Sequence, residues 1–333
     1  MSKSGRITPD LAVIEQVSQT TIRKAAALLR AGQLVAFPTE TVYGLGADAT
    51  NDTAVEAVYA AKRRPKSNPL IIHVADVEGA HRIAKLDERA KKLAREFWPG
   101  PLTMILPRHP RSAVSTSACA GLSTIAVRIP ANETALALIR ETGRPIAGPS
   151  ANASGKTSPT IAEHVVQSLG EVIPMVLDDG PCRIGIESTV INLSGAKALL
   201  MRPGGITVSD LEALIGPIAM PSATTEADHA SPGRAQSHYA PKLPVRLEAV
   251  DVNSDEALLA FGPDPLNGAG KMRNLSPAGN LDEAAANLYR MLIELDDSEF
   301  RQIAVMPLPE TGVGQAINDR LRRAAAPRPN PRN

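Results

Sequence analysis

A helix that leads directly into a strand is indicated by the stretch TAVEAVYAAKRRPKSNPLIIHV, which runs from Thr53 to Val74. Apolar side chains recur at helical spacing between Thr53 and Arg63, and Pro65 then ends the helix. The apolar run Pro69–Val74 is typical of a buried strand. Helices and strands that alternate in this way predict an α/β fold, in which the two kinds of element pack as layers.

The same alternation continues on both sides of this stretch. We expect further helices over Thr21–Ala31, Arg89–Trp98, Glu133–Glu141, Leu281–Leu295 and Gly314–Ala326, and strands over Leu34–Phe37, Leu102–Leu106, Thr124–Ile129, Pro145–Ala147, Val172–Leu177, Thr189–Leu193, Ala198–Met201, Val245–Val250, Ala257–Phe261 and Gln302–Met306. Some of these strands follow one another without a helix between them. The sequence therefore predicts a mixed sheet rather than a purely parallel one.

The pattern is interrupted between residues 218 and 244. This segment is rich in Pro, Ser, Thr and Ala and has no apolar periodicity, which is typical of a linker. It is longer than ordinary loops, so it is either functional or disordered. We therefore divide the chain into a first domain over 1–217, a linker over 218–244 and a smaller α/β domain over 245–333.

Composition weighs against several classes of protein. The chain has 36 Lys and Arg against 35 Asp and Glu, so a broad nucleic-acid-binding face is not demanded, and its 3% of aromatic residues offers few stacking platforms. Its two cysteines form neither a CxxC motif nor a disulfide framework. No secretory h-region and no apolar run of membrane-spanning length is evident. These features predict a cytoplasmic protein.

Cations and small hydroxyl residues gather in three segments. Lys62, Arg64 and Lys66 stand at the end of the first helix described above, and the loops PTETVYGLG (38–46) and PSANASG (149–155) are rich in hydroxyls and glycine. This combination favours a small phosphorylated ligand. A solvated helix end is the alternative. Lys62, however, continues the apolar stripe of the helix, so we expect its side chain to point inward.

Two polar residues stand in strands that are otherwise apolar. Arg128 shares a strand face with Thr124, and it must find either an acidic partner or a substrate carboxylate. His73 lies in an apolar run, where a lone histidine is usually a satisfied core residue. The acids Glu40, Asp178, Asp179 and Glu187 lie in or beside loops and would suit Mg²⁺, although most such acids are simply solvated.

Other motifs are weaker. The run GLGADA from Gly44 matches a dinucleotide fingerprint, but the acid expected about 20 residues later is missing, and a glycine turn is the alternative. Gly155-Lys156-Thr157 lacks the first glycine of a P-loop, so an exposed turn is favoured. No serine lies in a GxSxG elbow, and no HExxH or HxxxH zinc pair is present.

Several ordered motifs together resemble the threonylcarbamoyl-AMP synthases in their long form, with a YrdC-like domain. They are FPTETVYGLGADA (37–49), KRRPKSNPLIIHV (62–74), FWPGPLT (97–103), VRIP (127–130), PSANASGKTSPT (149–160), ESTVI (187–191), RPGGI (202–206) and SHYAP (237–241). The resemblance implies a YrdC-like twisted mixed sheet with helices, followed by a smaller Rossmann-like α/β domain. It also implies that L-threonine, bicarbonate or CO₂, and ATP with Mg²⁺ give threonylcarbamoyl-AMP and pyrophosphate. The product would feed N6-threonylcarbamoyladenosine formation at position 37 of tRNA, a transfer made by other proteins.

The resemblance also implies roles for particular residues. Lys62 and Arg64 would be catalytic, and no protein side chain is assigned to a metal. Threonine would be held by Thr41, His73, Arg128 and Ser188, and ATP by Arg64, Asn68, Thr124, Ser150, Asn152, Ser158, Arg202 and Tyr239, with Tyr239 closing over the nucleotide. Two other classes remain open alternatives: a non-catalytic RNA-binding protein and an NAD-linked oxidoreductase.

Overall fold

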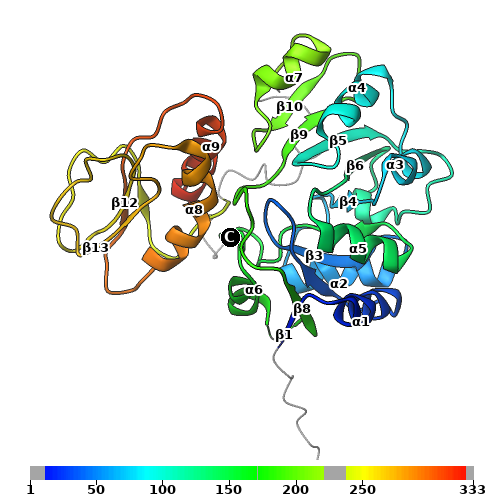
Figure 1. Ribbon diagram of the computed structural model, residues 1–333, viewed down its shortest axis with the longest axis horizontal. Helices are drawn as coiled ribbons and strands as arrows, with labels where there is room; N and C mark the ends of the chain where they lie inside the picture. The colour runs from blue at the N-terminus through cyan, green and yellow to red at the C-terminus, as the bar shows by residue number, and fades with distance from the viewer. Residues whose placement is uncertain (1–11, 171, 221–237, 328–333) are drawn as a thin grey trace, which may run out of the picture.

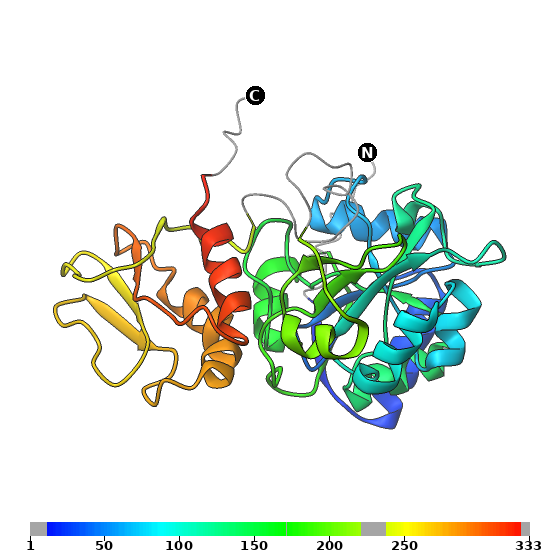
Figure 2. The ribbon, with the colours of Figure 1, turned by 90° about the horizontal axis from the view of Figure 1, so that it is seen from above.

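The computed structural model describes residues 12–170, 172–220 and 238–327. Most of the predicted linker, residues 221–237, therefore lies outside the described residues. Figure 1 shows two units, each built on its own sheet, with helices α8 and α9 of the smaller unit facing the larger one, and Figure 2 shows the same arrangement from above.

The larger unit is built on a ten-stranded sheet. In spatial order its strands are β1 (Val13–Gln16), β8 (Met175–Asp178), β2 (Val35–Phe37), β3 (Gly44–Asp48), β7 (Ile146–Ala147), β4 (Ile71–His73), β6 (Thr124–Arg128), β5 (Leu102–Pro107), β9 (Thr189–Asn192) and β10 (Leu199–Arg202). Strands β4 and β6 are parallel, whereas β5 and β6 are antiparallel. The predicted mixed sheet is confirmed.

The helices of this unit begin and end where the sequence supplies caps. They are α1 (Gln19–Arg30), α2 (Asp52–Lys62), α3 (Val77–Ile83), α4 (Glu88–Phe97), α5 (Glu133–Thr142), α6 (Ala162–Leu169) and α7 (Val208–Ile215), with a 3₁₀ turn η1 at Ser117–Cys119. The Asn51 side chain accepts a hydrogen bond from the Ala54 amide and so starts α2, and Arg63 ends it in a left-handed conformation. This end places Lys62 and Arg64 beside the sheet.

The smaller unit is a four-stranded sheet whose strands all run parallel. Their order is β11 (Val245–Arg246), β14 (Ile303–Val305), β12 (Ala257–Ala260) and β13 (Lys271–Asn274), and the helices are α8 (Leu281–Leu295) and α9 (Gly314–Ala325). Val42 and Ile186 of the larger unit belong to the same apolar cluster as the buried faces of these helices. The two units therefore pack together through apolar side chains.

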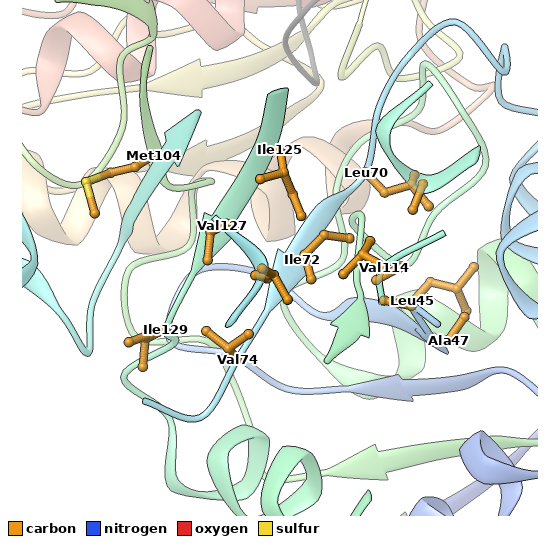
Figure 3. Packing of buried hydrophobic residues seen from close by; sticks show 14 of the residues in the cluster. Leu45, Ala47, Leu70, Ile72, Val74, Met104, Val114, Ile125, Val127 and Ile129 are labelled. Carbon is orange, nitrogen blue, oxygen red and sulfur yellow. The ribbon is translucent and has the colours of Figure 1, made fainter. Parts of the chain in front are cut away.

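The core of the larger unit is aliphatic, as the low aromatic content requires. Figure 3 shows Ile72 and Val74 beside Ile125 and Val127 within it. Because side chains alternate along a strand, His73 and Arg128 point to the other face of the sheet. Arg128 and Thr124 therefore share a face, as the sequence predicts, and this face carries the polar side chains His73 and Arg128.

The GLGADA run forms strand β3 rather than a turn between strand and helix. Neither Gly44 nor Gly46 has a positive φ, so the expected glycine turn is wrong as well. A Cβ atom on Gly44 would lie 2.9 Å from the Phe37 ring, and one on Gly46 would lie 3.0 Å from the Val35 carbonyl. Close packing of β3 on β2 therefore explains both glycines, and the dinucleotide interpretation fails.

Within the described ranges, no helix combines the length and apolar character that crossing a bilayer requires.

Candidate active site

One small cavity gathers most of the predicted site residues. It lies on the polar face of the sheet, beside β4 and β6, and is lined by Thr39, Thr41, Val42, Gly44, Arg64, Ile71, His73, Arg128, Gly148, Pro149, Ser150, Glu187, Ser188, Arg202, His238 and Tyr239. Three of these are arginines and one is a carboxylate, so the lining is cationic. Its volume is about 50 Å³.

Arg128 is held from three directions at the end of β6. Its Nη1 donates to Thr41 Oγ1 at 2.8 Å, its Nε donates to the Gly100 carbonyl at 3.2 Å, and its Nη2 lies 2.7 Å from Glu40 Oε1. The pair with Glu40 is buried, but its angles are not those of a hydrogen bond, so Nη2 and both carboxylate oxygens keep unused hydrogen-bonding capacity. The acidic partner foreseen for Arg128 is therefore present, and Nη2 is the one guanidinium nitrogen that makes no hydrogen bond.

His73 stands next to Arg128 on the neighbouring strand β4. Burial, together with the Arg128 charge, lowers the pKa of this imidazole to about 3, so it is neutral near pH 7. Its Nδ1 has no hydrogen-bond partner. A Cβ atom at Gly148 would lie 2.9 Å from that nitrogen, so glycine keeps the space beside it open. His73 thus lines the cavity with an unpaired Nδ1. It is not the satisfied core residue that a lone histidine in an apolar strand usually is.

Lys62 is fully buried, as its place on the apolar stripe predicts. Its Nζ donates to the Ser150 carbonyl at 2.5 Å and also to the Asn152 carbonyl. Burial lowers the pKa of this amine well below its usual value, and the nearby Arg64 charge adds to the effect. Lys62 therefore anchors the PSANASG loop from behind and does not line the cavity.

Arg64 lines the cavity and is oriented by the next turn of chain. Its Nη2 donates to Asn68 Oδ1 at 2.5 Å and to the Pro69 carbonyl at 2.9 Å. Burial lowers the pKa of Arg64 to about 10, which still leaves it charged near pH 7. Asn68 thus serves as a support for Arg64 in this conformation.

Arg202 is the last residue of β10 and the first of the RPGG segment, and its side chain lines the cavity. Its Nε and Nη2 donate to the Ser188 carbonyl at 3.1 and 3.0 Å, and Nη2 also reaches Ser188 Oγ at 3.1 Å. A Cβ atom at Gly204 would lie 2.3 Å from the Thr189 amide nitrogen. Only glycine therefore lets this loop pack against the Glu187–Thr189 segment, which carries Ser188.

The described end of the linker covers the cavity. His238 and Tyr239 are both buried, and their rings meet edge to face with 4.1 Å between centroids. The chain here is tied to both units: the His238 amide donates to the Arg323 carbonyl at 3.2 Å, and the Ala240 amide donates to the Gly155 carbonyl at 2.9 Å. Tyr239 has a left-handed φ of 64°, which is uncommon for a bulky residue.

Glu187, considered at first as a metal ligand, instead joins the two units. It is buried and accepts hydrogen bonds from Ser158, Tyr289 and Arg320. Tyr289 and Arg320 were missed from the sequence. Arg320 stands between Ile317 and Leu321 on the buried stripe of α9, so the rule that found Lys62 would have found it too.

The structure sorts the predicted residues into three groups. Those lining the cavity are Thr41, Arg64, His73, Arg128, Ser150, Ser188, Arg202 and Tyr239. Those bonded to residues of the lining are Lys62, Asn68, Asn152 and Ser158. Thr124 lies at the far end of β6, on the face of Arg128, and it is not part of the lining.

No cluster of three His, Cys, Asp or Glu side chains exists among the described residues. Glu40 faces Arg128, Glu187 joins the two units, and Asp178 and Asp179 are bonded to Tyr43 and Thr134. The four acids considered for Mg²⁺ are therefore not grouped as a protein-built metal cage.

Buried polar atoms without hydrogen-bond partners are concentrated around this cavity. In the described part of the chain, such side-chain atoms belong to Glu40, His73, Arg128, Asn152, His164, His238 and Tyr239. All except His164 line the cavity or contact residues that do. Because native proteins rarely leave buried polar groups unpaired, this concentration indicates a place that a polar ligand completes. A larger cavity, about 610 Å³, lies between α3 and α5 and contains none of the predicted site residues.

Comparisons with known proteins agree on one family. Residues 27–204 match the Sua5/YciO/YrdC family model, described as "Telomere recombination", and residues 206–326 match the model described as "Threonylcarbamoyl-AMP synthase, C-terminal domain". The chain is 42% identical to a threonylcarbamoyl-AMP synthase of Bacillus subtilis, covering 92% of this chain and 93% of that one. It is 41% identical to the corresponding protein of Pyrococcus abyssi, covering 94% and 96%. The crystal structure of P. abyssi Sua5 complexed with L-threonine superposes with a TM-score of 0.85 at 38% identity, covering 95% and 97%.

Proposed function

Because the chain belongs to the two-domain threonylcarbamoyl-AMP synthase family, we propose that the cavity beside β4 and β6 binds the substrates of that reaction. The protein is an enzyme that forms threonylcarbamoyl-AMP, and threonine is its substrate. The observation that carries the site assignment is the concentration of unpaired buried polar atoms around this cavity.

In this proposal threonine binds in the half of the cavity lined by Thr41, His73 and Arg128. Arg128 Nη2 makes no hydrogen bond and is suited to donate to an oxygen of the substrate carboxylate, which is a charge-assisted contact. The unpaired oxygens of Glu40 lie beside that nitrogen and suit the substrate ammonium group. Neutral His73 has an open Nδ1 that suits the substrate hydroxyl without adding a third charge.

The triphosphate and nucleotide suit the opposite half. Arg64 and Arg202 line it, and Ser150 supplies a hydroxyl from the PSANASG loop. The Lys62 amine holds that loop through two carbonyls. Two fixed guanidinium groups would stabilise charge on the α-phosphate and on departing pyrophosphate without reorganising during the reaction.

The reaction then needs positioning rather than a protein nucleophile. The threonine amine, after losing a proton, attacks the carbon of CO₂ or bicarbonate to give a carbamate, and water leaves when bicarbonate is used. A carbamate oxygen attacks the α-phosphorus of ATP, the bond to the β-phosphate oxygen breaks, and pyrophosphate departs. Both steps join groups that Arg128 and Arg64, which line the same cavity, would hold in position.

Magnesium would enter with the nucleotide. Mg²⁺ usually keeps several waters and binds through substrate phosphates with one or two carboxylates. The described residues supply no side-chain cage for it, so we propose MgATP as the substrate form, with charge on the phosphates shared between the ion and the arginines.

The linker residues His238 and Tyr239 act as a lid in this proposal. Ligand sites in proteins usually measure about 300–1,000 Å³, whereas the covered cavity measures about 50 Å³. The lid must therefore move to admit ATP and close again to exclude water from the labile carbamate. We place the reaction in the cytoplasm, with the product passed to the proteins that transfer the threonylcarbamoyl group to tRNA.

Pyrophosphate release tests this function. Purified protein is given ATP with and without L-threonine and with and without bicarbonate, and pyrophosphate is measured. We expect release that requires all three. Release that ignores threonine, or no release at all, would contradict the proposal, and a salt-dependent gel shift with RNA would then support the non-catalytic RNA-binding alternative.

A further inference from the structure

Arg320 contacts all three parts of the chain from a fully buried position on α9. Its Nε donates to Glu187 Oε2 at 2.7 Å and its Nη2 donates to the Pro203 carbonyl at 2.9 Å, both in the larger unit. Its guanidinium carbon lies 5.2 Å from the centre of the Tyr239 ring, in the linker. Its Nη1 pairs with Asp319 of its own helix at 2.6 Å.

The carboxylate that Arg320 binds also orients a predicted nucleotide residue. Glu187 Oε1 accepts from Ser158 Oγ at 2.6 Å, and Tyr289 OH contacts both carboxylate oxygens at 3.0 and 2.9 Å. Burial alone would raise the pKa of Glu187, but the charges of Arg320 and Arg202 outweigh it and lower that pKa to about 2. The group is thus ionised and fully bonded when the two units are together.

The same contacts hold the lid in place. The Tyr239 ring contacts the His238 ring and the Tyr289 ring, whose centroid is 5.7 Å away, and the Arg320 guanidinium lies over it. The left-handed backbone of Tyr239 is unfavourable for its side chain, so neighbouring contacts must maintain it. Three hydrogen-bonded partners outside the lid, Glu187, Pro203 and Asp319, fix the Arg320 guanidinium in position, and the Tyr239 ring of the closed lid lies against it.

We propose that Arg320 is a positioning residue that locks the lid shut and sets the nucleotide half of the cavity. It fixes Tyr239 through its guanidinium face, Ser158 through Glu187, and the Arg202 loop through Pro203. The second domain therefore supplies part of the support for the site, in addition to anchoring the linker. The nucleotide role rests on the proposed function, whereas the lock on the lid does not.

Hydrogen exchange measures the lock without any catalysis. The variants are Arg320→Met and, as a matched control on the same helix, Arg322→Met, whose exposed side chain pairs with exposed Glu310. We expect the ligand-free Arg320→Met chain to exchange the amides of His238 and Ala240 roughly tenfold faster or more, because the closed lid loses its partner. The control should match the parent protein. Unchanged exchange in folded Arg320→Met would overturn the lock.

Arg320→Lys covers the case in which the methionine variant does not fold. Lysine keeps the charge but lacks the planar fork that reaches Glu187 and Pro203 together. We expect faster exchange at the same two amides here too, and parent-like exchange in this variant would overturn the inference.

Steady-state kinetics test the nucleotide role. In Arg320→Lys we expect the KM for ATP to rise about tenfold, the scale of one lost charge-assisted hydrogen bond, and the KM for threonine to change less than about twofold. A purely structural role would raise both constants together, and that result would overturn the positioning role. If the parent protein released no pyrophosphate, the proposed function would fail while the exchange experiment still decided the lock.

Discussion

Arg128 and Glu40 form a buried ion pair. Variants of this pair test the stability of the fold separately from the binding of threonine. In Arg128→Met the Glu40 carboxylate would remain buried without its cation, which typically costs about 3–5 kcal/mol. The double variant Glu40→Gln/Arg128→Met removes both charges, so we expect much of this stability to return. Urea unfolding of the two variants measures the difference.

Threonine binding should not recover with stability. The double variant still lacks the guanidinium group proposed for the substrate carboxylate, so we expect the KM for threonine to rise tenfold or more while the KM for ATP changes little. A double variant that is stable and binds threonine normally would contradict the assignment of Arg128.

Two buried histidines predict how stability depends on pH. Burial lowers the pKa values of His73 and His238 to about 3, from about 6.5. Between these values the unfolded chain binds protons that the folded chain does not, so the free energy of unfolding is highest above about pH 6.5 and falls as pH decreases toward 3. Each histidine contributes about 1.4 kcal/mol per pH unit within that window.

Urea unfolding between pH 7 and pH 5 measures this slope. His238→Asn should remove the contribution of one histidine from the slope of the unfolding free energy against pH. His81→Asn, which changes an exposed imidazole on α3, is the matched control. An equal slope in the parent protein and His238→Asn would show that the buried imidazole of His238 is not the group that titrates.

At the residue scale, the sequence predicts the direction of a side chain where that direction follows from the local helix or strand periodicity. Lys62 was expected to point inward because it continues a helical stripe, and it is buried. The partners of Glu187 were not predictable in this way, because Ser158, Tyr289 and Arg320 come from segments far apart in the chain. Their meeting depends on how the two units pack.

At the scale of elements, the RPGG loop depends on glycine at one position. In Gly204→Ala the new Cβ atom would meet the Thr189 amide nitrogen at 2.3 Å and the Glu187 carbonyl at 2.5 Å, so backbone must shift. We expect a loss of about 1–3 kcal/mol of stability. Because Arg202 is the first residue of this segment, the KM for ATP should rise as well.

Gly195→Ala is the matched control for the loop variant. Nothing lies within 4 Å of the Cβ position at Gly195, and its φ is not positive. We expect its stability to stay within about 0.5 kcal/mol of the parent protein. Thermal melting and ATP titration of both variants test the comparison, and a Gly204→Ala protein that behaves like its control would contradict the packing argument.

Long periodic elements were predicted well and short or glycine-rich ones were not. The helix at Leu281–Leu295 was expected with the bounds it has. Strand β3 was missed because Gly44 and Gly46 read as a turn, although they serve close packing on Phe37. Helices α3, α6 and α7 were also missed, and each has at most eight residues, too few for a strong periodic signal.

At the scale of the whole molecule, the sequence indicates the fold class but not the strand order. Interleaved helices and strands predict a mixed sheet, and the structure has one. That β8 lies between β1 and β2 depends on contacts between segments more than a hundred residues apart. The packing of Val42 and Ile186 against the second unit also joins segments that are far apart in the chain. No local sequence pattern predicts it.

The packing of the two units predicts how a chain that ends at Ile218 would fold and how much of its activity it would keep. The ten-stranded sheet is complete by Arg202, so we expect the shortened chain to fold and to melt cooperatively. It would lack Tyr239, and Glu187 would lose Tyr289 and Arg320, so pyrophosphate release dependent on threonine should fall at least about a hundredfold, the scale of losing two buried hydrogen-bonded partners.

The control for this truncation ends at residue 327 and keeps every described element. Circular dichroism melting reports folding, and pyrophosphate release reports turnover, for both chains. A folded short chain with full turnover would show that neither the lid nor the Arg320 contacts are needed, because the larger unit would then complete the nucleotide half of the cavity by itself. A short chain that fails to melt cooperatively would instead show that apolar contacts at Val42 and Ile186 are required for the larger unit to fold.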